Sequence, residues 1–171
     1  MEDEGEDLKE HLTAKYGPRA TASFDDPNSH LKRMGRLAGI EFTNDRKIYP
    51  TLKAHALLEY AKEQDNEQAN SLMEVIFHRY FEKGENINDV EVLKNIAGEV
   101  GMEADKAEEA INDWRNIEGV KAKDENVKTR MGVSGVPFFI VKGANSGRPT
   151  GFSGAQPSEL IAELLQEMSD E

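Results

Sequence analysis

Cysteine is absent from the 171-residue sequence, so the chain itself has no thiol chemistry. A thiolate is the nucleophile of disulfide exchange, so the polypeptide as written cannot carry out that reaction. Structural disulfide bonds are excluded on the same ground. The cysteine count does not identify a redox compartment, because a lost or truncated motif would leave the same composition.

Positive charge is scarce as well. The sequence has 21 Lys and Arg residues against 33 Asp and Glu residues, a formal net charge of -12. An acidic surface repels nucleic-acid phosphates and anionic lipids, so we expect neither a nucleic-acid partner nor a membrane partner. No apolar run is long enough to cross a bilayer, and Met1 is followed by acidic residues instead of a basic and apolar leader. We therefore expect a cytoplasmic protein.

Recognisable catalytic and metal-binding constellations are also missing. The histidines are too widely spaced to form a ligand pair on one helix, and no cysteine joins them. They are His11, His30, His55 and His78. Carboxylates are scattered as on solvated helix faces, and Ser134 and Ser153 lack a Gly-x-Ser-x-Gly signature. The sequence predicts no metal site, no cofactor and no catalytic residue.

Packing explains two further groups of side chains better than function does. His55 follows Ala54 on the expected inner side of a helix, which predicts a partly buried, hydrogen-bonded histidine and not an acid–base catalyst. Four aromatic residues have the spacing of core positions, which favours packing over a ligand pocket. They are Phe77, Tyr80, Phe81 and Trp114.

Helical periodicity dominates the chain as far as residue 131, and caps and glycine stops divide it into segments. Residues 1–7 are expected to fray, and residues 40–42 to be extended. The length suits one domain over residues 1–171, with a helical subdomain at about 48–131. The predicted helices cover residues 7–16, 26–38, 50–64, 66–83, 89–100, 104–114 and 117–131.

A different pattern begins at Gly132. Pro137 precedes four large apolar residues and cannot donate to a sheet ladder, so a strand is predicted to start after it, over residues 138–141. Glycines on both sides of Ser134 predict a shaped turn before that strand. The pattern alone favours an ordinary trans bond before Pro137.

The C-terminal segment is predicted to continue as a hairpin and a helix. Residues 142–148 form a polar, glycine-containing turn, and residues 149–153 a second short strand. Pro157 then suits the first turn of a closing helix. The apolar residues of that helix recur at helical spacing and are Leu160, Ile161, Leu164, Leu165 and Met168.

Two motifs in this region carry a family resemblance. The run from Gly132 to Phe139, together with Ser-Gly-Ala-Gln-Pro at 153–157, resembles the C-terminal half of DsbA-like thioredoxin-fold proteins. The most similar branch is the FrnE-like one, which includes putative DsbA oxidoreductases and relatives of 2-hydroxychromene-2-carboxylate isomerase. Residues 6–17 and 51–55 also resemble this branch. Pro50 departs from it, because the branch usually has asparagine there.

The resemblance implies an α/β, mostly helical fold: a partial thioredoxin-like fold with an inserted helical subdomain and a C-terminal β-hairpin plus helix over 132–171. It implies a cis bond between Val136 and Pro137, in a loop that faces a Cys-x-x-Cys motif. It also implies that Val136 and Pro137 bind an extended peptide, a thiol substrate or glutathione through the backbone before the proline. This binding needs no side-chain chemistry.

The family segment that carries the first strand and the redox cysteines has no counterpart in this chain. In the family that strand lies beside the one expected at 138–141, which would therefore have an open edge here. We expect a homodimer through this edge, coverage of the edge by the chain's own helices or residues 40–42, or a chain that is part of a longer product.

Three functions remain open. The chain belongs to a thiol–disulfide oxidoreductase of the DsbA and FrnE type whose catalytic part it lacks, so that it does not exchange disulfides by itself. Alternatively, it is a catalytically silent thioredoxin-fold protein that binds a peptide or partner through the proline loop. The third function is that of a relative of glutathione-dependent isomerases or transferases.

Overall fold

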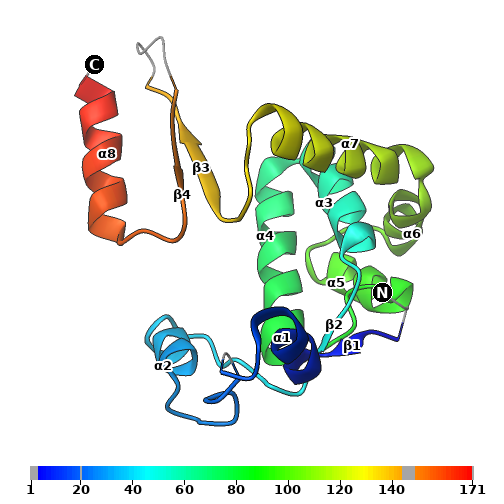
Figure 1. Ribbon diagram of the computed structural model, residues 1–171. Coiled ribbons are helices and arrows are strands. Elements are labelled where there is room, and N and C mark those ends of the chain that lie inside the picture. The colour runs from blue at the N-terminus through cyan, green and yellow to red at the C-terminus, as the bar shows by residue number, and fades with distance from the viewer. Residues whose placement is uncertain (1–3, 20, 144–148, 171) are drawn as a thin grey trace. The chain divides into compact units, whose positions relative to one another are not determined.

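The computed structural model describes residues 4–19, 21–143 and 149–170 (Figure 1). The chain forms two compact units, Met1–Lys121 and Ala122–Glu171. The division falls within one helix, α7 (Trp114–Arg130). The single domain predicted over residues 1–171 and its subdomain boundary near residue 131 stay predictions.

Unit 1 is held together by four helices around one hydrophobic cluster. Helices α3 and α4 pack side by side, and α5 and α6 complete the cluster (Figure 1). Burying one large aliphatic side chain contributes about 1.5–3 kcal/mol, so this cluster is the main source of the unit's stability. The helices are α3 (Leu52–Gln64), α4 (Asn66–Phe77), α5 (Val90–Glu99) and α6 (Ala104–Asn112). The largest fully buried side chains are Leu57, Leu72, Leu93, Ile96 and Ile111.

Short polar side chains set the ends of these helices, as the sequence predicts. Asp65 ends α3 and also caps α4, where its Oδ1 accepts a hydrogen bond from the Glu67 N–H at 2.8 Å. Asp89 caps α5 by accepting from the N–H groups of Glu91 and Val92. After α5 the chain reverses at Gly101, whose φ of 78° suits glycine.

The junction between α6 and α7 differs from the prediction. Trp114 begins α7 instead of ending the preceding helix, because Asp113 is extended and closes α6. The Asp113 carboxylate accepts hydrogen bonds from the Arg115 backbone N–H at 2.9 Å and from its guanidinium at 2.7–3.1 Å. The Arg115 side chain and N–H hold the pKa of Asp113 below its usual value.

The N-terminal part of unit 1 contains a small sheet that the sequence did not predict. Strand β1 (Glu6–Asp7) pairs antiparallel with β2 (Lys47–Ile48), and α1 (Leu8–Tyr16) follows β1 directly. The expectation that residues 1–7 fray is therefore wrong for Glu6 and Asp7, which lie in a strand. Residues 40–42 lie in no strand, and the Thr43 N–H donates to the Phe81 carbonyl at 2.9 Å.

Two helices depart from their predicted bounds. The helix expected over 26–38 is α2 (His30–Leu37), because the Asp26 carboxylate accepts from the Asn28 N–H and holds a turn before it. The helix expected over 66–83 continues beyond α4 as η1 (His78–Glu82), a π-helical turn in which the Lys83 N–H donates to the His78 carbonyl.

Unit 2 contains the predicted hairpin and closing helix. Strands β3 (Phe138–Val141) and β4 (Thr150–Ser153) pair antiparallel, with Phe138 opposite Ser153. The rings of Phe139 and Phe152 stack across the pair, with centroids 4.9 Å apart. Helix α8 (Ser158–Asp170) follows and buries Met168.

Truncation of Leu72, which is fully buried in α4, tests the cluster. Leu72→Ala removes apolar contacts and leaves a cavity, so the free energy of unfolding should fall by about 2–5 kcal/mol. Leu72→Met keeps the volume and should cost less than about 1.5 kcal/mol. Urea unfolding followed by circular dichroism measures both, and equal losses would show that the site is not tightly packed.

The Asp113–Arg115 pair predicts a pH dependence. A carboxyl whose pKa is lowered in the folded state stabilises that state above its unfolded pKa, and the contribution is lost as pH falls through the folded value. The stability difference between wild type and Asp113→Asn should therefore be largest near neutral pH and shrink below about pH 4.

An NMR titration of Arg115→Gln provides the matched control. The pKa of Asp113 should rise towards its usual value but not fully reach it, because the backbone N–H of residue 115 still donates to the carboxylate. An unchanged pKa would show that the guanidinium is not the cause of the shift.

Candidate functional site

The loop before β3 is fixed at both ends. On the helix side, Val133 is buried and its N–H donates to the Val127 carbonyl of α7 at 3.4 Å. On the strand side, the Pro137 carbonyl accepts from the Gly154 N–H at 2.9 Å, next to the end of β4. Gly132 has a φ of 65° and so permits the reversal after α7. The loop therefore has a defined conformation between two anchors.

The centre of this loop presents backbone to solvent. The Val136–Pro137 bond is cis, so the trans bond that the pattern alone favours is wrong. Val136 as a residue is 89% exposed. Among the described residues, no group hydrogen-bonds to the N–H or C=O of Val136. These two groups are therefore free to pair with an incoming extended chain.

The chemistry open to this loop is binding. Its residues from Gly132 to Pro137 include no titratable side chain, and Ser134 is exposed and hydrogen-bonds to no base in the described part of the chain. A proton-transfer or nucleophilic step would need groups that the loop does not contain. Recognition of a backbone segment needs only the two polar groups of Val136.

The sheet beside the loop has only two strands among the described residues, so both of its edges lack a strand partner there. Within the described ranges, β3 pairs with β4 only, and its other edge has no strand partner. Two of its apolar residues are partly open to solvent, Phe139 at 38% and Ile140 at 52% exposed. Unpaired strand edges favour association with another extended segment.

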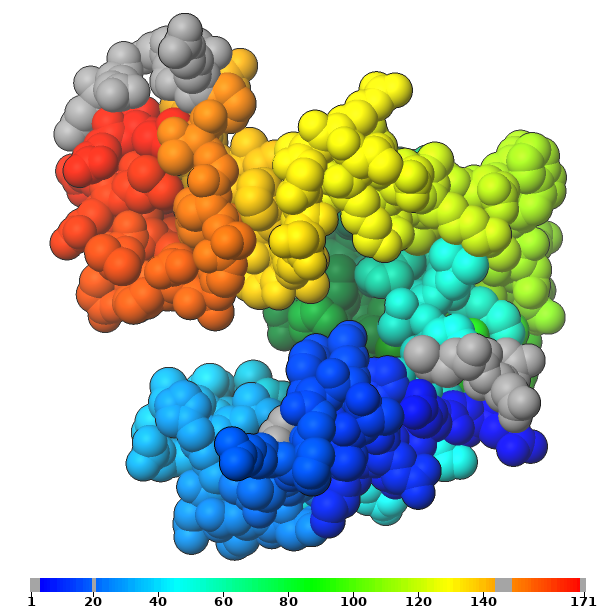
Figure 2. Space-filling model, viewed as in Figure 1, coloured from blue at the N-terminus to red at the C-terminus, as the bar shows by residue number. Residues whose placement is uncertain are grey.

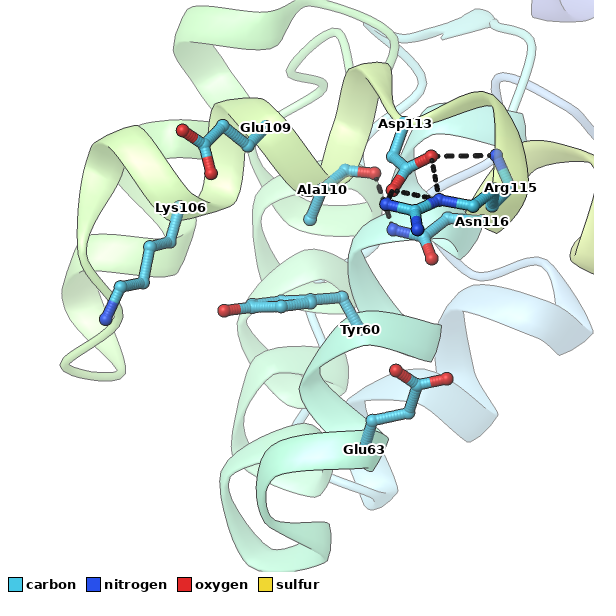
Figure 3. Close-up of a pocket in the computed structure, with 8 residues that line it drawn as sticks. All are labelled: Tyr60, Glu63, Lys106, Glu109, Ala110, Asp113, Arg115 and Asn116. Atoms are coloured by element: carbon cyan, nitrogen blue, oxygen red, sulfur yellow. Dashed lines mark hydrogen bonds and ion pairs between the residues drawn. The ribbon is translucent and has the colours of Figure 1, made fainter.

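A polar hollow of about 500 Å³ lies in unit 1 (Figure 3). In this view the Tyr60 ring of α3 lies between Glu63 below and Ala110 of α6 above. The Asp113–Arg115 pair closes one end, where the Asn116 side-chain amide donates to the Ala110 carbonyl at 2.9 Å. No sequence motif marks this hollow, because its lining comes from three separate elements.

Both cations in the hollow have carboxylate partners. Lys106 is paired with Glu103 at 3.2 Å, and this hydrogen bond raises the pKa of the Lys106 ammonium group. The Asp113 carboxylate likewise raises the pKa of Arg115. Exposed ion pairs of this kind contribute little to stability and are common on helix surfaces, so the hollow carries no sign of catalysis.

Several side chains lie where the sequence did not place them. His55 is exposed instead of partly buried, and its ring has no recorded partner among the described residues. Trp114 is 70% and Phe77 48% exposed, so the prediction that both are core residues is wrong. Tyr80 and Phe81 are half-buried, and their rings contact each other edge to face.

Two other kinds of site are absent from the described residues. No group of three or more His, Asp or Glu side chains is arranged to hold a metal ion in that part of the chain. Likewise, none of the helices in the described ranges has the length and apolarity needed to cross a membrane.

Comparison with known proteins agrees with the motifs around the loop. The sequence matches the DSBA-like thioredoxin domain family over residues 17–166. A probable DsbA oxidoreductase from Streptomyces coelicolor has a similar structure, with a TM-score of 0.78 and 27% sequence identity. The similarity covers 97% of this chain and 68% of that one. No curated protein matches the sequence.

The family match spans most of the chain, including the loop, the hairpin and most of α8. The mostly helical α/β architecture agrees with a DsbA-like thioredoxin fold that contains an inserted helical region. This chain therefore belongs to the DSBA-like thioredoxin domain family.

Proposed function

We propose that this chain is the substrate-binding part of a FrnE-like thiol–disulfide oxidoreductase, and that it binds extended peptides through the backbone of Val136. The observation that carries the proposal is the unpaired N–H and C=O of this exposed residue, in a loop anchored at both ends. An extended peptide would form strand-like hydrogen bonds with both groups. Membership of the family supports this assignment.

Binding and redox chemistry are separable in this proposal. The sequence has no cysteine, so the thiolates that attack a disulfide have to come from outside this polypeptide. By itself the chain holds a peptide substrate without oxidising or reducing it. Val136 and Pro137 are its substrate-binding residues, and the chain contributes no catalytic residue.

The open edge of β3 belongs to the same proposal. A strand from a partner, from a further segment or from a second copy would pair with Phe138–Val141 and cover the exposed Phe139 and Ile140 side chains. Substrate bound at Val136 and a strand paired with β3 use different backbone groups, so one does not require the other.

Titration of the isotope-labelled chain with a short, unstructured peptide tests peptide binding. The peptide carries a carbamidomethylated cysteine, which prevents disulfide chemistry from contributing. Backbone amide resonances of residues 132–137 should shift saturably, with Val136 among the largest shifts, because its N–H gains a hydrogen bond. An insulin-reduction assay of the same sample should show no activity above background.

Two variants separate backbone recognition from side-chain contact. Val136→Pro removes the N–H and should weaken peptide binding about tenfold, since the peptide carbonyl loses its donor. Val136→Ala keeps the N–H and should bind within about threefold of wild type, because little side-chain area is lost. The proposal would be refuted if wild type and the two variants bound the peptide with equal affinity. It would also be refuted if the peptide shifted only amide resonances outside residues 132–137.

A further inference from the structure

Residues of α1 and of the first turn of α2 line a hollow of about 330 Å³ in unit 1, which we name the α1–α2 hollow. Figure 2 shows the two segments next to each other, with α1 in blue and α2 and its flanking loops in light blue. The loop before α2 and residues 42–46 complete the lining. Pockets for small molecules have volumes of about 300–1,000 Å³, so the hollow is large enough for a small ligand.

Apolar side chains form much of the wall of the α1–α2 hollow. They are Leu8, Leu12, Phe24, Leu31 and Phe42. Leu8 is buried, and Leu12, Phe24 and Phe42 are half-buried, so this part of the wall is fixed by the fold. Leu31 is 60% exposed and is free to cover a bound molecule. An apolar chain in the hollow would be removed from water on several sides.

The charged groups of the lining are basic. Lys32 and Arg46 are half-buried, and neither has a carboxylate partner among the described residues. The Lys32 ammonium group donates to the Phe24 carbonyl at 3.2 Å, and Arg46 Nε donates to the Thr43 carbonyl at 3.4 Å. Both side chains have further N–H groups for which the described residues provide no recorded acceptor. Partial burial of an uncompensated cation is unfavourable, and an anion in the hollow would offset that cost.

The carboxylates that follow Phe24 in the sequence do not line the hollow. Asp25 is paired with Lys9 at 2.5 Å, and Asp26 accepts a hydrogen bond from the Asn28 N–H at 2.8 Å. The described lining contains no Asp or Glu residue, although the chain has a net charge of -12. The hollow is therefore a local basic site on an acidic protein.

A neighbouring hollow of about 360 Å³ has a different rim. The two hollows share three lining residues, and Arg46 is one of them. Glu74 and Glu82 line only the neighbouring hollow, where they would repel an anion. The Arg46 guanidinium lies 4.9 Å from the Phe81 ring centroid, and this contact helps to fix its position. The difference between the rims favours the α1–α2 hollow as the place for a negatively charged ligand.

We propose that the α1–α2 hollow binds a small amphipathic carboxylate, with its apolar chain against the leucine and phenylalanine side chains and its carboxylate held by Lys32 and Arg46. A guanidinium group matches the geometry of a carboxylate. Ser29, which also lines the hollow, makes no capping hydrogen bond, so backbone N–H groups at the start of α2 are further donors. The site lies within unit 1, and it depends neither on peptide binding at Val136 nor on redox chemistry.

Three probes compared on wild type separate charge from apolar contact. Octanoate has a carboxylate and a chain, 1-octanol has the chain alone, and acetate has the carboxylate alone. Octanoate, used below the concentration at which it forms micelles, should bind at least about tenfold more tightly than either of the others. NMR titration of the isotope-labelled chain measures the affinities, and the saturable shifts should be largest at residues that line the hollow. This comparison does not depend on the folding of any variant.

Lys32→Gln removes one cation from the lining. The glutamine amide is still able to donate to the Phe24 carbonyl, so the local hydrogen bond has a replacement. Octanoate should bind about tenfold more weakly to this variant, because its carboxylate loses a charged donor, whereas 1-octanol should bind unchanged.

Arg33→Gln is the matched control. It removes the same charge from an exposed residue of α2 that does not line the hollow. Octanoate should bind within about twofold of its wild-type affinity, since an exposed charge is screened by solvent and salt. Circular dichroism should show the same helix content for wild type and both variants.

Four results would overturn the proposal. Equal affinities of wild type for octanoate and 1-octanol would show that the hollow does not recognise an anion, and equal affinities for octanoate and acetate that it does not recognise the chain. Equal weakening by Lys32→Gln and Arg33→Gln would indicate only a general attraction to basic residues. Octanoate shifts that do not saturate, or that occur only at residues outside the lining, would show that the hollow is not the binding site.

Discussion

Burial of aliphatic side chains between α3, α4, α5 and α6 is the constraint on which unit 1 depends. The chain has no disulfide, and the ion pairs of the described residues are mostly exposed and individually weak. The stability of unit 1 therefore depends on this cluster and on the residues that cap its helices. The small β1–β2 sheet and α2 lie outside that cluster. Beside α2, the Phe42 ring contacts Phe81, and the Arg46 guanidinium lies over the Phe81 ring.

In unit 2 a short hairpin and one helix follow the loop that contains Val136. The loop that contains Val136 is anchored through Val133 and Pro137, so its exposed backbone is held in place by bonds from its neighbours. The same unit leaves one edge of β3 unpaired by described residues.

Local signals in the sequence predicted most helices well, because single residues mark where the helices begin or end. Examples are Asp65, Asp89 and Gly101. The hairpin and α8 followed from the proline and glycine positions. Pairing of β1 with β2 could not be predicted, since two-residue strands carry no periodic pattern and their partners are far apart in sequence.

The errors at two single side chains have different local causes. In the sequence, Trp114 continues the apolar spacing of α6, but the chain breaks at Asp113 and a new helix with a different orientation begins at Trp114. His55 was assigned the inner side from its neighbour Ala54, although successive residues on a helix point about 100° apart. The loop at Val136 was found because its motif is contiguous, whereas the hollow beside Tyr60 assembles residues from three elements.

The corner at Asp65 limits where the chain can vary in length. One residue ends α3 and begins α4, so there is no loop in which an added residue could be accommodated. An insertion there would turn α4 by about 100° and carry Leu72 and Ile76 out of register with the other helices. Homologues should therefore keep this corner at constant length and place their insertions in segments such as 21–29, which contain no helix or strand.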